Sequence, residues 1–535
     1  MAGRRLMVLL LMVAAFLAAA AAPTGASSKS SAVVFELIHR EQAPWAELAR
    51  MDRERMAFIS SCRGRRAAET GTSRTKAEHK AKAAPAADEA FAMPLSSGAY
   101  TGTGQYFVRF RVGTPAQPFL LVADTGSDLT WVKCRLCSIF GSCLPLLGGV
   151  VRSSAWAERG TGYGYGYGAP ASNDSPSLPA SSSPPAQARV FRPDDSRTWA
   201  PIPCSSDTCT ASLPFSLASC PTPGSPCAYD YRYKDGSAAR GTVGTDSATI
   251  ALSGARGAAA ATASTRNRKQ RRAKLRGVVL GCTTSYNGDS FMASDGVLSL
   301  GYSNISFASR AAARFGGRFS YCLVDHLAPR NATSYLTFGP NPALSSSASP
   351  KQTACTGSPP GARETPLLLD HRMRPFYAVT VNGISVDGEL LKIPRLVWDI
   401  EKGGGTILDS GTSLTVLASP AYRAVVAALS KKLAGLPRVT MDPFDYCYNW
   451  TSPSTGEDLT VAVPELAVHF AGSARLQPPV KSYVIDAAPG VKCIGVQEGE
   501  WPGVSVIGNI LQQEHLWEFD IKNRRLRFKR SRCTQ

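Results

Sequence analysis

Short stretches of alternating apolar and polar residues recur along most of the chain, and a period of two predicts β-strands. Residues 106–112 alternate in this way, and the apolar stretch 119–123 follows after a turn signal. The same plan returns downstream, where 376–381 precede Asn382-Gly383, a pair typical of tight hairpins, and 406–408 are again apolar. The pattern therefore predicts a mainly β protein built from two related lobes.

Helical periodicity is sparse in this chain. The best helical candidate is 420–434, where alanine and other apolar residues recur at the spacing of one helix face. Ser419 and Pro420 suit the start of this helix, and Gly435 suits its end.

Three segments have compositions that cannot supply a packed core, and we expect them to be mobile surface loops. Residues 144–187 are rich in Gly, Ser and Pro, and residues 341–363 are rich in Ser and Pro. Residues 254–276 are first rich in alanine and then basic, between strands expected at 248–252 and 277–280.

The first 92 residues differ from the rest and are typical of segments removed from a mature protein. Two arginines, an apolar stretch and an alanine run make 1–26 a predicted signal peptide, with a membrane anchor as the alternative. Residues 27–92 are rich in Ala, Arg and Lys, and we interpret them as a pro-segment, with a disordered tail as the alternative. In an exported protein, four Asn-x-Ser/Thr sequons are candidate glycosylation sites: Asn173, Asn304, Asn331 and Asn449.

The length and charge of the chain limit its organisation. A chain of 535 residues is too long to fold around a single hydrophobic core. We therefore expect an N-terminal lobe at 93–340, a linker at 341–363 and a C-terminal lobe at 364–535. The formal net charge is +19, and seven positive charges lie within 266–276. This run could pair with phosphates, but a solvated or protease-cut loop is the interpretation we favour, so nucleic acid is not an expected partner.

The chain has 14 cysteines, which predict disulfide bonds in an exported protein. Zinc is the alternative for Cys134 and Cys137, but the neighbouring cysteines do not form two clean ligand pairs and histidine is scarce, so we expect no metal. Cys62 falls in the predicted pro-segment. An odd number then remains, and Cys355 is our candidate for the unpaired thiol.

Two four-residue segments carry the strongest functional signal. Each follows an apolar stretch and has an acid, a small hydroxyl residue, a glycine and another hydroxyl residue: Asp124-Thr125-Gly126-Ser127 and Asp409-Ser410-Gly411-Thr412. An acid that ends a buried strand is poorly solvated, so its charge requires donors or a partner acid. A single such motif is most simply a turn, but two copies with matching flanks indicate one catalytic pair assembled from two halves.

The predicted catalytic residues are Asp124 and Asp409. Two carboxylates a few ångströms apart can share one proton, so that one acts as general base and the other as general acid. Water held between them could attack a peptide carbonyl without a covalent intermediate. The glycine of each motif would let the backbone approach the carboxylate, and the last hydroxyl could donate to its outer oxygen. The six histidines lie near no serine or cysteine nucleophile motif, and no phosphate-binding loop competes.

On these motifs, the region from about 105 to 528 closely resembles the pepsin-like aspartic proteases, and within them the plant nepenthesin-like branch. The resemblance implies a bilobal pepsin-like fold of two related β-lobes with the active-site cleft between them. It implies that Thr125 and Ser410 form a hydroxyl lock between the acid loops. It also places residues 506–509 under the second acid and 33–40 in a strand of the pro-segment.

The resemblance further implies a flap hairpin at 227–237. Tyr233 would cover the substrate with support from Trp131, and Gly236 and Ser237 would be further substrate-binding positions. From the residues alone, a tyrosine before Asp-Gly-Ser indicates no more than an ordinary hairpin.

The leading hypothesis is an aspartic-type endopeptidase that hydrolyses peptide bonds at acidic pH without a cofactor. Its expected partners are protein or peptide substrates and its own pro-segment, and we expect a monomer in the apoplast, with the vacuole or a plastid as alternatives. The competing hypothesis is a catalytically inactive binding protein on the same fold, such as the plant xylanase inhibitors that resemble this branch. Both acids, both glycines and all four hydroxyl positions are present, which favours the enzyme.

Overall fold

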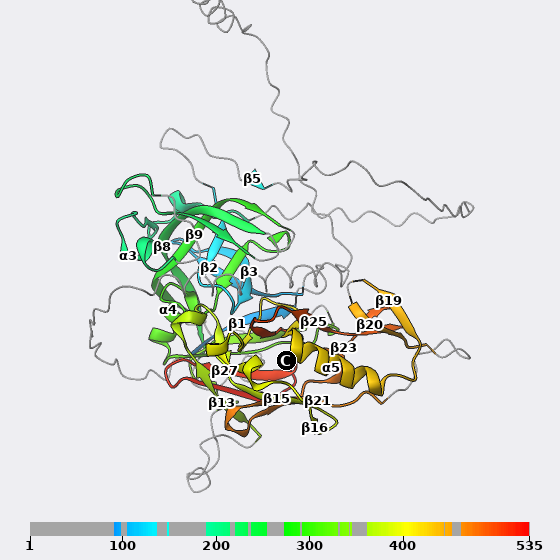
Figure 1. Cartoon of the computed structure of the whole chain (residues 1–535). Helices are drawn as coiled ribbons and strands as arrows, with labels where there is room; N and C mark the ends of the chain where they lie inside the picture. Colours follow the sequence, from blue (N-terminus) through cyan, green and yellow to red (C-terminus); the bar gives the residue numbers. More distant parts are fainter. Residues whose placement is uncertain are drawn as a thin grey trace, which may run out of the picture. The chain divides into compact units, whose positions relative to one another are not determined.

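The alternating stretches form β-strands in a computed structural model of the chain (Figure 1). In β2 (Tyr106–Val112) the exposed positions are Arg109 and Arg111, and the apolar side chain between them is buried. β3 (Gln117–Asp124) pairs with β2 in antiparallel fashion and is buried over its last four residues. The first predicted strand pair is therefore confirmed.

The structure describes only part of the chain: residues 90–97, 104–135, 147–148, 189–213, 220–233, 237–253, 272–288, 291–329, 332–341, 343–344, 361–442, 444–451 and 462–533. The predicted signal peptide, nearly all of the predicted pro-segment and most of the predicted loops at 144–187 and 341–363 lie outside these residues. Within them, no helix combines the length and the apolar character that a bilayer span requires.

Strands dominate both halves of the chain. In the first half the elements are β1 (Ala90–Ser97), β2, β3, β4 (Trp131–Lys133), β5 (Leu147–Gly148), β6 (Ala200–Pro201), α3 (Asp207–Thr210), β7 (Ala228–Arg232), β8 (Ala238–Ser253), β9 (Arg272–Asn287), β10 (Gly296–Ser299), α4 (Phe307–Arg314), β11 (Arg318–Cys322) and β12 (Thr333–Phe338). In the second half they are β13 (Arg363–Leu368), β14 (Tyr377–Val379), β15 (Val381–Val386), β16 (Glu389–Leu390), β17 (Thr406–Leu408), β18 (Thr415–Ala418), α5 (Ser419–Lys432), β19 (Arg438–Met441), β20 (Phe444–Asn449), β21 (Leu466–Phe470), β22 (Arg475–Leu476), β23 (Val484–Ala488), β24 (Val491–Ile494), β25 (Val496–Gly499), β26 (Ser505–Ile507), β27 (His515–Asp520) and β28 (Arg525–Arg530).

One antiparallel layer contains strands from both halves, in the order β1-β12-β11-β27-β28-β13. The halves join where β11 pairs with β27, from Arg318 opposite Asp520 to Cys322 opposite Leu516. β1 begins at Ala90, within the last residues of the predicted pro-segment. The backbone of those residues therefore takes part in the sheet that joins the halves.

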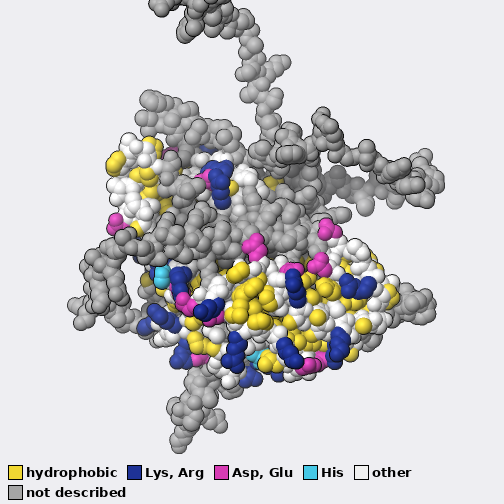
Figure 2. Space-filling view, viewed as in Figure 1, with side chains coloured by type: hydrophobic (Ala, Val, Ile, Leu, Met, Phe, Trp, Pro, Cys, Tyr) yellow, Lys and Arg dark blue, Asp and Glu magenta, His cyan; other side chains and the backbone are white. Residues whose placement is uncertain are grey.

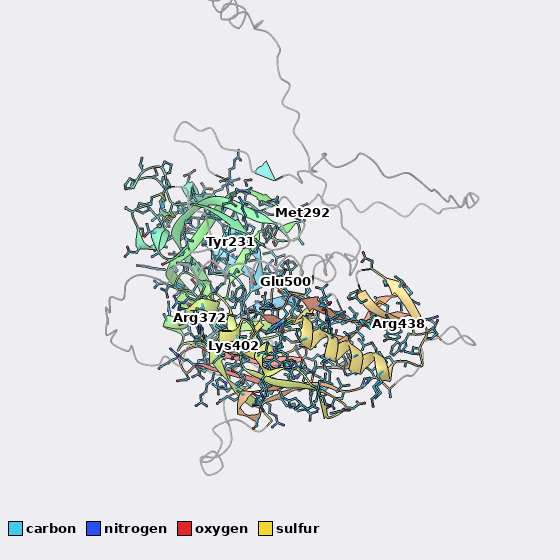
Figure 3. All side chains as sticks on the ribbon, in the orientation of Figure 1. Tyr231, Met292, Arg372, Lys402, Arg438 and Glu500 are labelled. Atoms are coloured by element: carbon cyan, nitrogen blue, oxygen red, sulfur yellow. A yellow bond between two sulfur atoms is a disulfide. The ribbon has the colours of Figure 1, made fainter. Side chains whose placement is uncertain are left out.

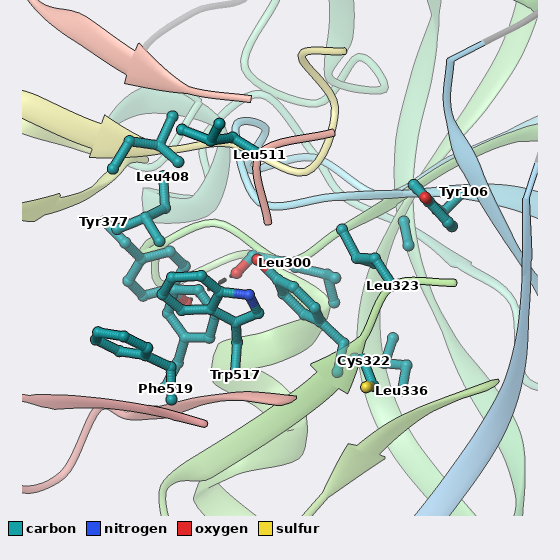
Figure 4. Close-up of a cluster of buried hydrophobic side chains, with 14 of the residues drawn as sticks. Tyr106, Leu300, Cys322, Leu323, Leu336, Tyr377, Leu408, Leu511, Trp517 and Phe519 are labelled. Atoms are coloured by element: carbon teal, nitrogen blue, oxygen red, sulfur yellow. Dashed lines mark hydrogen bonds between the residues drawn. The ribbon is translucent and has the colours of Figure 1, made fainter. Parts of the chain in front are cut away.

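Aromatic side chains fill the core beside this joining layer (Figure 4). The rings of Phe319 and Phe519 stack with centroids 4.8 Å apart, and Trp517 stacks on Phe528 at the same distance. Tyr377 of β14 packs against Phe519 at 4.8 Å. Each such side chain stabilises the fold by roughly 1.5–3 kcal/mol through burial, so this cluster holds both halves together.

The duplication predicted from the sequence is visible in the strand pairing. β3 runs parallel to β10, with Asp124 opposite Ser299. In the second half β17 runs parallel to β26, with Leu408 opposite Ile507. Each acid motif therefore leaves a strand that is flanked by a parallel strand from the same half.

Two local predictions for the second half have different outcomes. The hairpin predicted at Asn382-Gly383 is wrong, because both residues lie inside β15, where the pairing with β21 shifts register. The turn falls at Asp387-Gly388, where φ is 50° and 81°, and joins β15 to β16. Asn-Gly and Asp-Gly give the same turn signal. The turn forms at Asp387-Gly388 because the pairing of β15 with β21 keeps Asn382-Gly383 inside a strand. The predicted helix is confirmed as α5.

The predicted strands 248–252 and 277–280 are parts of β8 and β9, a much longer antiparallel ribbon. The prediction that a loop extends to 276 is therefore wrong. Lys274 and Arg276 are exposed and Leu275 between them is buried, so this basic stretch has the alternation of a strand. Residues 254–271 lie outside the described residues.

Disulfide bonding is confirmed for ten cysteines. The described pairs are Cys134–Cys282, Cys204–Cys220, Cys209–Cys227, Cys322–Cys533 and Cys447–Cys493. Since Cys134 is bonded to Cys282, it does not form a ligand pair with Cys137. The predictions for Cys62 and Cys355 lie outside the described residues.

Candidate active site

Both acid motifs form buried loops with the same local geometry. Asp124 ends β3 and Asp409 directly follows β17, and they are 2% and 0% exposed. In each loop the glycine two residues later, Gly126 or Gly411, donates its backbone N–H to the Oδ1 of the acid at 2.9 Å. These bonds fix the orientation of each carboxylate.

Crossed hydroxyl bonds hold the two loops together. The backbone N–H of Thr125 donates to Ser410 Oγ at 3.0 Å, and the backbone N–H of Ser410 donates to Thr125 Oγ1 at 2.9 Å. Each hydroxyl also donates across to the other half, Ser410 to the Ala123 carbonyl at 2.9 Å and Thr125 to the Leu408 carbonyl at 3.4 Å. Thr125 and Ser410, which directly follow the two predicted catalytic acids, therefore contact each other. This is the hydroxyl lock that the resemblance implied.

The hydroxyls at the fourth motif position differ between the halves. Thr412 Oγ1 donates to Asp409 Oδ2 at 2.7 Å, as expected. Ser127 is 1% exposed, and its Oγ has no hydrogen-bond partner among the described residues. The hydroxyl at the fourth position therefore supports the acid of its own motif in the second loop but not in the first.

A second strand supports each acid from the same half. The backbone N–H of Asp409 donates to the Ile507 carbonyl at 3.1 Å, so β26 passes beside the second acid as the resemblance implied. In the first half, Leu300 donates its N–H to the Asp124 carbonyl at 2.8 Å. This counterpart was missed in the sequence, although Leu300-Gly301 repeats the pattern of apolar residues before a glycine.

A buried glutamine beneath the second acid was also missed. Gln512 is 0% exposed, and its Nε2 donates to the Ile507 carbonyl at 2.8 Å and to the Asp409 carbonyl at 3.4 Å. Its Oε1 accepts from the Tyr321 hydroxyl at 2.5 Å. Burial raises the pKa of Tyr321 well above its usual value, and the negative charge of Asp409 adds to this effect. No sequence motif marks Gln512 for this position.

The predicted flap is a hairpin of β7 and β8, and it contacts the first acid loop. Trp131 Nε1 donates to the Tyr233 hydroxyl at 2.6 Å, and Tyr231 (labelled in Figure 3) donates to Asp128 Oδ1 at 2.9 Å. The carbonyl of Ser237 accepts from the Tyr233 N–H at 2.8 Å. Gly236 lies outside the described residues.

Phe291 completes an aromatic group around the flap tyrosine. Its ring centroid lies 4.9 Å from that of Trp131 and 5.0 Å from that of Tyr233. Its carbonyl accepts from Lys133 Nζ at 2.9 Å, and burial lowers the pKa of this lysine to about 8. Neither Phe291 nor Lys133 was predicted, because the contact depends on how the chain after β9 returns to β4.

The four candidate sequons have different environments. Asn304 is exposed. Asn449 is partly buried, and its Oδ1 accepts from the Thr451 N–H at 3.0 Å and from the Thr451 hydroxyl at 2.6 Å. Asn173 and Asn331 lie outside the described residues.

The crossed bonds between the acid loops can be measured as a coupling energy. We expect Thr125→Val and Ser410→Ala each to destabilise the protein by about 1–3 kcal/mol, since each leaves a buried N–H without its acceptor. The double variant should lose less than the sum, with a coupling energy on the order of 1 kcal/mol or more in urea denaturation.

The matched control for this cycle is Thr130→Val with Ser299→Ala, a buried hydroxyl pair at 2.8 Å within one half. Both pairs should show coupled stability, but only the pair between the acid loops should also lower proteolytic activity. Additive costs for Thr125 and Ser410 would contradict the inferred lock.

Two related halves, each with an acid loop and joined by crossed hydroxyl bonds, define the pepsin-like class of fold. Solved structures agree with this over most of the chain. The crystal structure of edgp has a TM-score of 0.55 and 20% identity, covering 83% of this chain and 96% of that one. Basic 7S globulin from soybean has a TM-score of 0.53 and 18% identity, covering 83% and 98%.

Sequence comparisons define the family. The family described as xylanase inhibitor N-terminal matches residues 106–154 and 176–340, and the one described as xylanase inhibitor C-terminal matches 376–530. Aspartyl protease family protein 2 of Arabidopsis thaliana is 31% identical over 451 residues, 83% of this chain and 74% of that protein. Aspartic proteinase nepenthesin-2 of Nepenthes gracilis is 28% identical, over 82% of this chain and 80% of that protein. The chain belongs to the pepsin-like aspartic protease family, in its nepenthesin-like branch.

Proposed function

We propose that this protein is an aspartic endopeptidase that hydrolyses peptide bonds at acidic pH, with Asp124 and Asp409 as its catalytic pair. The observation that carries the proposal is the set of crossed hydrogen bonds between Thr125 and Ser410. These bonds fix the residues next to both acids, so the two carboxylates are presented by loops in direct contact.

The hydrogen bond from Thr412 suits Asp409 to the proposed reaction. Thr412 donates to Asp409 Oδ2, and a donated hydrogen bond favours the ionised carboxylate. In the proposed reaction one carboxylate takes a proton from a bound water while the other, protonated, donates to the substrate carbonyl oxygen. The water attacks the carbonyl carbon, and the tetrahedral intermediate then expels the amine as it gains a proton.

The competing function is binding without catalysis, and the family descriptions that name xylanase inhibitors are the observation in its favour. The retained donors around both acids favour the enzyme, since a binding protein has no need of a hydroxyl aimed at a buried carboxylate.

The experiment that separates the two functions uses the purified protein with its predicted pro-segment removed. We expect it to cleave a denatured protein at acidic pH, and we expect pepstatin and Asp124→Ala to abolish the cleavage. Inhibition of a xylanase, with no cleavage at any acidic pH, would establish the binding function instead.

The flap contact gives a separate prediction. Tyr233→Phe removes the acceptor of the Trp131 indole N–H, so the flap should be less well positioned over a bound peptide. We expect kcat/KM for a peptide substrate to fall by roughly tenfold while the melting temperature changes little. The control is Tyr229→Phe in β7 of the same hairpin, which loses a buried hydrogen bond to Thr283 of β9 and should cost stability but not activity. Equal activity of the Tyr233 variant and the wild type would contradict the role of the flap.

A further inference from the structure

A group of four cationic side chains lies where β9 meets α4, and the proposed reaction does not use it. This group, the β9–α4 basic surface, consists of Lys274, Arg276, Arg310 and Arg314, all exposed. Arg310 donates Nε and Nη2 to the Arg276 carbonyl at 2.9 and 2.6 Å, and Arg314 donates Nη1 to the Lys274 carbonyl at 2.9 Å. The four residues therefore form one continuous patch on two packed elements.

Three of these cations are held by hydrogen bonds to neutral oxygens of the described residues. Lys274 Nζ donates to the Thr114 hydroxyl at 3.0 Å, and Arg310 and Arg314 donate to backbone carbonyls. The described residues give none of the four an ion pair with a carboxylate. The nearest carboxylate in this network is Asp246, which is reached through Thr198. Asp246 is 1% exposed and already accepts from the hydroxyls of Ser196 and Thr198, so it is not presented at the surface.

The geometry suits a repeating anion better than a single small one. Alternate residues on a strand lie roughly 6.7 Å apart, and residues four apart on a helix lie about 6 Å apart. Lys274 with Arg276, and Arg310 with Arg314, therefore present two parallel pairs of charges. The guanidinium groups of Arg310 and Arg314 each have five N–H donors and use two and one of them on the carbonyls. Because these two arginines are already held, binding an anion costs them less conformational entropy.

We propose that the β9–α4 basic surface docks an acidic polysaccharide, a chain that carries a carboxylate on successive sugars. Charge complementarity selects a polyanion. The five described disulfides indicate an oxidising compartment outside the cytosol, where carboxylated polysaccharides, and not nucleic acids, are the abundant polyanions. The inference is independent of proteolytic activity.

The test measures retention of the full secreted protein on immobilised polygalacturonate and the NaCl concentration that elutes it. Replacement of all four residues by glutamine should weaken binding by about tenfold or more at low salt and flatten its salt dependence. Because Arg310 and Arg314 also hold β9, a second variant changes Lys274 and Arg276 alone and should lose part of the affinity.

The matched control removes four exposed cations elsewhere, Lys392, Arg395, Lys402 and Lys431, by the same substitution. Figure 2 shows why it is needed: on the face drawn, Lys and Arg side chains are dispersed among acidic and apolar ones. We expect this control to elute like the wild type. Equal losses in both quadruple variants, no retention of the wild type, or full loss on deletion of 257–271 alone would each overturn the proposal. Stronger competition by duplex DNA or by anionic vesicles than by free polygalacturonate would also overturn it.

Discussion

Asp409→Asn should lower kcat/KM for a peptide substrate by at least about 1,000-fold. Asparagine keeps the shape of the side chain and can still accept from the Gly411 N–H, so the fold should remain intact. It cannot exchange a proton with water or with the partner acid, and the proposed reaction depends on that exchange. Asp124→Asn should have the same effect, and the double variant should be little worse than either single one, because the two acids act as one unit. The measurement is turnover of an internally quenched peptide at acidic pH.

The control for both variants is Asp246→Asn. Asp246 is a buried aspartate in the same half as Asp124, and its oxygens accept from hydroxyl groups. Its replacement should cost stability but leave the turnover of the folded fraction unchanged. Activity within a few-fold of wild type in either acid-loop variant would show that the corresponding acid is not catalytic.

Arg527→Met should destabilise the protein by about 3–5 kcal/mol at neutral pH. Arg527 Nη2 lies 2.6 Å from Glu518 Oε1, and the Glu518 side chain is 1% exposed. The remaining cation, Arg318, is 3.9 Å from the same oxygen. Without Arg527, the Glu518 carboxylate is still desolvated but loses most of the electrostatic attraction that offsets the cost of burying its charge. Urea denaturation at pH near 7 measures the effect.

The loss in Arg527→Met should shrink as the pH falls. Burial raises the pKa of Glu518 in the folded protein, and removing a neighbouring cation raises it further. A carboxyl whose pKa is raised on folding favours the folded state below its unfolded pKa, and this contribution is lost as the pH rises through the folded pKa. Protonated Glu518 needs no counter-ion, so the variant and the wild type should converge in stability toward acidic pH.

Two controls accompany this prediction. Arg525→Met removes an exposed ion pair with Glu364 and should cost less than about 1 kcal/mol. Arg527→Met combined with Glu518→Leu removes both charges of this pair and should recover part of the lost stability; Asp520, which lies 3.5 Å from Arg527, keeps Arg318 at 3.3 Å. If Arg527→Met lost as much stability at acidic as at neutral pH, the charge of Glu518 would not be the cause.

Sequence reasoning found the parts of the fold that depend on local pattern. The strand at 106–112 and the helix at 420–434 have strong periodicity and clear end signals, and both form. The acid loops were found because two copies of one motif are improbable as independent turns. The pairing of Thr125 with Ser410 was predicted from the family resemblance alone. No local pattern shows which residues meet across 285 positions of the sequence.

The missed features depend on long-range contacts. Asn382-Gly383 carries a hairpin signal, yet both residues lie inside β15. Its pairing with β21 continues past them with a shift in register. Lys274 and Arg276 belong to a basic run that suggested a loop, but pairing with β8 makes them part of a strand. Gln512 and Phe291 become neighbours of the acid loop and flap only after the halves have folded.

The pH dependence of kcat/KM for the processed protein tests most directly whether the two halves present acids that share a proton. We predict a bell-shaped profile whose two limbs both lie below neutral pH, roughly within pH 1 to 6, as two coupled carboxyl groups require. A profile governed by a single ionisation, or no turnover at any acidic pH, would contradict the account.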